Sequence, residues 1–171
     1  MRNNRLTILC LSLFLGFSFP AMAQKRSKED KLKAYIEARS LIDGKLYQFT
    51  GRWAYPQKGG QVDLMTRPNF LKIENDLVSA DMPYFGEVTG GNAGYGGSGG
   101  GITFNSEKKD YTVKYNDKKE NITISFKVMD GMESYNCIFI LSSVSSVSLS
   151  ISGTSRQIIR YMGEISGIEK N

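Results

Sequence analysis

Apolar and polar residues alternate in short runs over most of the chain. Residues 122–128 and 135–141, for example, carry an apolar side chain at every second position. Strands with one buried face alternate in this way, because successive side chains point to opposite faces. About ten such runs follow one another at intervals of roughly 8–12 residues, as in sandwiches and barrels. The pattern predicts an all-β fold: a single antiparallel meander over residues 46–165, forming a lipocalin-like barrel or curved sandwich.

The first run is rich in aromatic residues. Tyr47, Phe49, Trp53 and Tyr55 are separated by even numbers of residues, so they are predicted to share the inward face of one strand.

Turn residues divide the later runs. The short gap between residues 70–73 and 77–82 predicts a tight hairpin. Residues 102–104 and 111–115 are predicted to be two separate strands, because polar residues interrupt the alternation between them.

A different period precedes the strands. Leu32, Tyr35, Ile36 and Ile42 recur at helical spacing, which predicts a helix over residues 27–43. Ser27 and Asp30 form a sequence typical of a helix start, and Gly44 is a suitable stop. We expect this helix to cover an open end of the barrel, with a membrane-surface or partner-binding helix as the alternative.

The N-terminal segment has the layout of a secretory signal peptide. Arg2 and Arg5 precede an apolar run over residues 6–19, and Ala21-Met22-Ala23 forms a small-residue cleavage site. The apolar run is shorter than the roughly 20 residues of a membrane span. We therefore expect residues 1–23 to be removed, leaving one β domain over residues 24–171, without a transmembrane span, in the periplasm or outside the cell.

The composition excludes several kinds of catalysis. The chain contains no histidine, which rules out Ser-His-Asp and Cys-His mechanisms and two-histidine zinc sites. After signal removal only Cys137 remains of the two cysteines, so no intrachain disulfide can form. Nothing nearby would activate this thiol, and we expect it to be buried. No catalytic residue, cofactor site or metal site is predicted, and we expect a protein that is not an enzyme.

Glycine is concentrated in residues 86–101. Residues 94–99 match the pattern G-x-G-x-x-G, but a predicted strand follows where a dinucleotide site would need a helix. This glycine-rich loop is predicted to be a flexible linker or, alternatively, a lid over a cavity mouth.

The formal net charge is +5. Lysines are densest over residues 108–119, but acidic residues alternate with them. A surface that follows nucleic-acid phosphates would carry unopposed positive charge, so no nucleic-acid partner is predicted.

Several segments together resemble the domain of unknown function 4251 family, a group of uncharacterised exported proteins of Bacteroidetes-type bacteria. They are Tyr47-Gln48-Phe49, the segment Met82-Pro83-Tyr84-Phe85-Gly86, residues 101–104 and residues 155–165. The resemblance implies an exported protein, and it brings no established activity, ligand or catalytic residue.

The predicted barrel could hold a ligand. A barrel of about eight strands or more can enclose a ligand cavity, and the aromatic side chains of this chain could line it. A small apolar ligand, or an envelope protein, is therefore the first predicted partner. The alternatives are a structural or protein-interaction module with a filled core, and an enzyme that works without histidine. The residues predicted to line a cavity are Tyr47, Phe49, Trp53, Tyr84, Phe85 and Phe104.

Overall fold

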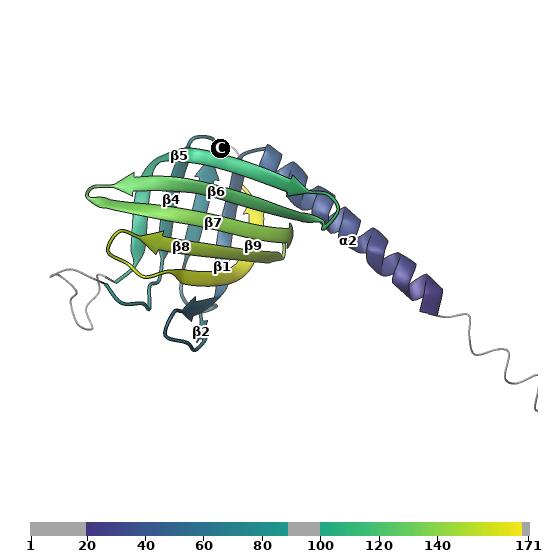
Figure 1. The fold of residues 1–171 in the computed structure, drawn as a ribbon, viewed down its shortest axis with the longest axis horizontal. Coiled ribbons are helices and arrows are strands. Elements are labelled where there is room, and N and C mark those ends of the chain that lie inside the picture. Colours follow the sequence, from purple (N-terminus) through teal and green to yellow (C-terminus); the bar gives the residue numbers. More distant parts are fainter. Residues whose placement is uncertain (1–19, 89–99, 169–171) are drawn as a thin grey trace, which may run out of the picture.

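The computed structural model describes residues 20–88 and 100–168, with the backbone alone for residues 20–26. Residues 1–19 of the predicted signal peptide and residues 89–99 of the glycine-rich loop therefore lie outside the described residues. Figure 1 shows one helix beside a curved sheet. The elements are α2 (Pro20–Asp43), β1 (Leu46–Pro56), β2 (Val62–Asp63), β3 (Phe70–Glu74), β4 (Leu77–Met82), β5 (Ile102–Asn116), β6 (Asn121–Asp130), β7 (Glu133–Ser143), β8 (Ser146–Gly153) and β9 (Ile159–Gly167).

The strands form one antiparallel sheet that closes on itself. Its order is β1-β3-β4-β5-β6-β7-β8-β9, and β9 pairs back onto β1 along nearly its full length. The short strand β2 is added to β1 beside this eight-stranded barrel. Eight strands enclose a space that side chains can just fill. The predicted all-β antiparallel barrel with an N-terminal helix is confirmed.

Local turn signals placed the β3–β4 hairpin correctly. Phe70 pairs with Asp81, and Glu74 pairs with Leu77. Asn75 has a positive φ of 56° in the connecting turn, a conformation that asparagine tolerates better than most residues.

Strand β5 differs from the prediction. The two short strands expected at residues 102–104 and 111–115 are parts of a single strand of 15 residues. A bulge between Lys109 and Thr112, where Asp110 has a φ of 55°, breaks the alternation without ending the strand. The first part of β5 pairs with β4 and the second with β6, so this strand turns a corner of the barrel.

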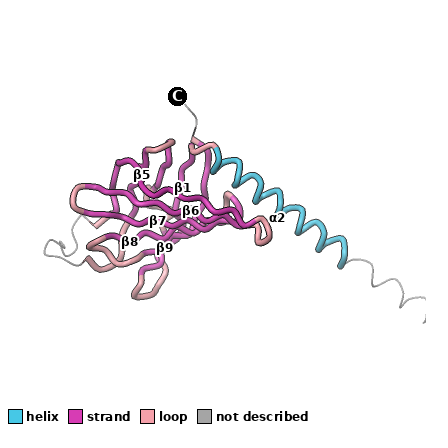
Figure 2. The backbone as a smooth tube through the Cα atoms, turned by 45° about the horizontal axis from the view of Figure 1, so that its top comes forward, coloured by secondary structure: helices cyan, strands magenta, loops and turns pink. Residues whose placement is uncertain are grey.

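Helix α2 is longer than predicted. It begins at Pro20, a residue suited to the first helical turn, so Ser27 lies within the helix and does not cap it. Its C-terminal half buries Tyr35, Ala38 and Ile42 against the barrel. The N-terminal half projects away from the strands (Figure 2). Within the described residues, no helix combines the length and apolar character needed to cross a bilayer.

Strand β1 changes face in its middle. Phe49 pairs with Ile165 and Gly51 with Gly163, all on the inner face, but the register then shifts and Trp53 pairs with Met162. Arg52 is the extra residue at this bulge. The prediction that Trp53 and Tyr55 share the inward face of Tyr47 and Phe49 is therefore wrong.

Two residues allow the close packing at the bulge: Gly163, which has no side chain, and Asn69, which hydrogen-bonds to the backbone. A Cβ atom at Gly163 would overlap the carbonyl oxygen of Thr50. The buried side chain of Asn69 accepts a hydrogen bond of 2.7 Å from the Gly51 amide and donates one of 3.1 Å to the Gly51 carbonyl. It thereby replaces a strand neighbour where β3 no longer pairs with β1.

Candidate functional site

Three of the six predicted cavity residues lie in the packed interior. Tyr47, Phe49 and Phe104 are buried, and aromatic neighbours pack against the latter two. The ring centroids of Phe49 and Phe139 are 5.7 Å apart, and those of Phe104 and Tyr135 are 5.2 Å apart. Side chains thus occupy the space in which a ligand was expected.

At the helix end of the barrel, the buried polar groups are neutral. The hydroxyls of Tyr47 and Tyr111 are buried and have no hydrogen-bond partner among the described residues. Burial raises the pKa of both phenols, and for Tyr47 the nearby Tyr111 raises it further. Neither group can therefore supply an ionised side chain near neutral pH.

Tyr84 and Phe85 lie at the opposite rim, before the glycine-rich loop. Both are half-buried. The Tyr84 hydroxyl is 3.0 Å from the Gln157 carbonyl, and the guanidinium of Arg156 lies 5.1 Å from the centre of its ring. Arg67 lies 5.6 Å from the centre of the Phe85 ring. These contacts connect the end of β4 to the β8–β9 connection and to the segment between β2 and β3.

Glu133 is the most engaged carboxylate of this rim. Ser155 and Tyr135 donate hydrogen bonds of 2.8 and 2.9 Å to it, and Arg156 forms an ion pair at 3.3 Å. Burial opposes ionisation of Glu133, but these partners outweigh burial and lower its pKa. Burial and the neighbouring Glu133 raise the pKa of Tyr135 to about 12. A carboxylate so fully bonded fastens the start of β7 to the β8–β9 connection and is poorly suited to proton transfer.

A second polar cluster fastens the helix to the barrel. Tyr35 donates a hydrogen bond of 2.6 Å to Asp117, which also pairs with Arg39 at 3.1 Å. Tyr115 donates to Asp43, and Arg39 lies 4.3 Å from the centre of the Tyr115 ring. The cluster therefore holds α2 against the end of β5.

The described residues provide little for metal or thiol chemistry. No three histidine, cysteine, aspartate or glutamate residues within 20–88 and 100–168 lie close enough together to hold a metal ion. Cys137 is buried, and burial raises the pKa of its thiol, which makes it a packing residue.

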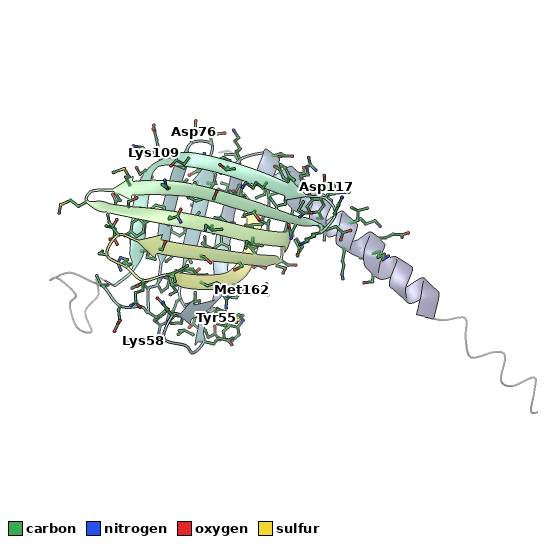
Figure 3. All side chains as sticks on the ribbon, in the orientation of Figure 1. Tyr55, Lys58, Asp76, Lys109, Asp117 and Met162 are labelled. Atoms are coloured by element: carbon green, nitrogen blue, oxygen red, sulfur yellow. The ribbon has the colours of Figure 1, made fainter. Side chains whose placement is uncertain are left out.

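The outer surface carries a more distinctive arrangement, centred on Trp53 and Tyr55. Pairing across β1, β9, β8, β7 and β6 aligns two rows of outward side chains, which we call the platform. The first row is Trp53, Met162, Ser148, Ile140 and Thr123, and the second is Tyr55, Arg160, Ser150, Ile138 and Ser125. Figure 3 shows Tyr55 and Met162 on the same side of the barrel.

Charge is sparse on the platform. Arg160 is its single charged residue, and its guanidinium lies 5.4 Å from the centre of the Tyr55 ring. Beside the rows, Arg52 pairs with Glu164. Three platform residues, Met162, Ser148 and Ile140, also line a surface hollow of about 310 Å³. The platform thus combines aromatic faces, hydroxyl groups and one cation, an arrangement that can stack on a ligand and hydrogen-bond to it.

Comparison with known proteins settles the family. The sequence model described as "Domain of unknown function (DUF4251)" matches residues 29–165. This chain belongs to the DUF4251 family. A crystal structure of a DUF4251 family protein from Bacteroides eggerthii DSM 20697 is similar, with a TM-score of 0.62 and 15% identity, over 80% of this chain and 89% of that one. At this identity the likeness concerns the fold alone. No curated protein matches the chain.

In this DUF4251 protein, little in the sequence indicates the platform. The alternation predicts Trp53 in the cavity and Tyr55 on the same inward face, because it does not reveal the bulge at Arg52. One usable signal was present in β8, where residues 146, 148, 150 and 152 are all serine while the residues between them are buried and apolar. Such a strand presents a row of hydroxyls on its outer face.

Proposed function

We propose that this DUF4251 protein is an exported, non-enzymatic interaction module of the cell envelope, which binds through the platform outside a filled barrel. One observation carries the proposal. Trp53 and Tyr55 lie on the outer face of β1, while packed side chains fill the space inside. Clustered aromatic side chains on a surface are typical of binding sites.

Other features agree with export and with a role without catalysis. Residues 1–23 have the layout of a secretory signal. The most engaged carboxylate, Glu133, is already bonded to Ser155, Tyr135 and Arg156. A small apolar ligand inside the barrel receives less support, because Phe49 and Phe104 pack on other aromatic rings there.

Fractionation of a Gram-negative host that produces the full chain tests the export. We expect the protein in the envelope or outside the cell. Its intact mass should be that of a chain whose first residue is Gln24. A protein found only in the cytoplasm, or one that retains residues 1–23, would contradict this part of the proposal.

Cosedimentation of the purified mature protein with isolated envelopes tests the binding surface. Tyr55→Ala and Trp53→Ala should release the protein into the supernatant. Phe70→Ala is the matched control, since Phe70 is a half-buried aromatic residue on β3, outside the platform, and Lys72 lies 5.2 Å from the centre of its ring. Equal sedimentation of all variants would rule out the platform as the binding surface.

A further inference from the structure

The platform has the surface chemistry of a sugar-binding face. Trp53 and Tyr55 are two residues apart on the same side of β1, so their Cα atoms are separated by about 6.6 Å. The C–H groups on the face of a sugar ring pack well against aromatic faces of this kind.

Hydroxyl groups distinguish this face from the centre of a protein–protein interface. Ser125, Ser148 and Ser150 lie among the ten platform positions, together with Thr123. Serine is depleted at protein–protein interfaces. Short hydroxyl side chains both donate and accept hydrogen bonds, which suits a ligand that is itself covered with hydroxyls.

The charge of the platform indicates the class of sugar. Arg160 is exposed, and among the described residues it forms no ion pair within 4 Å. The neighbouring charges of Arg52 and Lys58 are paired with Glu164 and Glu87. A guanidinium stacked on an aromatic ring keeps its edge free to donate two parallel hydrogen bonds to a carboxylate.

We infer that the platform binds a polysaccharide that carries carboxylate groups, an inference that rests on the proposed function. Trp53 and Tyr55 stack on the sugar rings, and Arg160 pairs with a carboxylate. The hollow beside Met162, Ser148 and Ile140 receives a further sugar unit of the same chain.

Calorimetric titration of the mature protein with two probes tests the inference. One probe is an oligogalacturonide, in which every unit carries a carboxylate, and the other is an uncharged glucan oligomer of equal length. We expect the acidic probe to bind about tenfold more tightly at low salt. Added salt should narrow the difference. Trp53 is the single tryptophan of the chain, so its fluorescence should change in both titrations.

Variants separate the roles of the platform residues. Arg160→Gln should remove the roughly tenfold preference for the acidic probe, so that the variant binds both probes with equal affinity. Tyr55→Ala and Trp53→Ala should each weaken the affinity for both probes by about tenfold or more. If Trp53→Ala fails to fold, as judged by circular dichroism, Trp53→Leu provides an apolar replacement without the aromatic face. Lys72→Ala removes a cation beside an outer aromatic ring away from the platform and should change neither affinity.

Three results would overturn the inference. If both probes bind equally and Arg160→Gln changes nothing, the carboxylate specificity is wrong while the sugar-binding platform stands. If neither probe binds but envelope cosedimentation still depends on Trp53 and Tyr55, the partner is a protein, and the proposed function survives. If neither probe binds, and Trp53→Ala and Tyr55→Ala sediment with the envelopes as the unmodified protein does, the inference and the proposed function fail together.

Discussion

The two halves of β1 carry the same kind of side chain in opposite surroundings. Tyr47 and Phe49 in the first half are fully buried, whereas Trp53 and Tyr55 in the second half lie on the outer face. A single extra residue, Arg52, separates the two pairs. Because side chains alternate with a period of two, one inserted residue moves every later side chain to the other face. The bulge thus converts one aromatic strand into a core segment followed by a surface segment.

The largest expected effect comes from removing the space that the bulge needs. In Gly163→Ala the new methyl group would overlap the Thr50 carbonyl, so β1 and β9 could not pair as they do. We expect a loss of more than about 5 kcal/mol in the free energy of unfolding, or no folding at all. Urea denaturation measures this. Gly167→Ala on the same strand is the control, since its new methyl group would make only an ordinary contact with Leu41. Similar stability of the two variants would contradict the close approach of Gly163 to the Thr50 carbonyl.

The two aromatic pairs should also differ in their contribution to stability. Phe49→Ala removes a fully buried ring that packs on Phe139, and it should cost about 3–5 kcal/mol. Trp53→Ala removes a half-buried ring on the outside and should cost less than about 2 kcal/mol. Chemical denaturation of both variants under the same conditions measures the two losses in the free energy of unfolding. A greater loss for Trp53→Ala would place Trp53 in the core.

A smaller effect should follow from removing the side chain that supports the bulge. Asn69→Ala would leave the buried amide and carbonyl of Gly51 without their partner, at a cost of about 2–4 kcal/mol. Asn105→Ala is a suitable control, because Asn105 is exposed on β5 and should change stability by less than about 0.5 kcal/mol. Thermal unfolding followed by circular dichroism measures both. Equal melting temperatures would mean that Asn69 does not hold the bulge.

Elements defined by neighbouring residues could be predicted from the sequence. The β3–β4 hairpin and the end of α2 near Gly44 follow from short-range turn and capping signals, and both are present. The start of α2 was misplaced, because Ser27 and Asp30 fit a helix start equally well inside a longer helix. The alternation correctly indicated the buried faces of β6, β7 and β8.

The bulges and the platform could not be predicted in this way. A bulge is defined by pairing with a partner strand. The strand opposite the bulge at Arg52 is β9, far along the chain, and the strand opposite the bulge at Asp110 is β6, across a hairpin. The platform is assembled from five strands, so its rows exist only once the register of each strand is fixed. Tyr47, Phe49 and Phe104 were rightly identified as inward residues, but periodicity cannot tell a packed interior from a cavity.

The seam between β1 and β9 has a consequence for the order of folding. It joins residues more than a hundred positions apart in the chain, such as Tyr47 and Gly167, whereas β3–β4 and β5 to β9 are linked by consecutive hairpins. Hairpins form in about 1–10 μs, and contacts across so long a loop form later because of the entropy lost in closing it. Until the seam closes, β1 and β9 each present an unpaired edge, which is prone to aggregation. For a chain exported as we propose, those two edges are the surfaces that a periplasmic chaperone would have to shield.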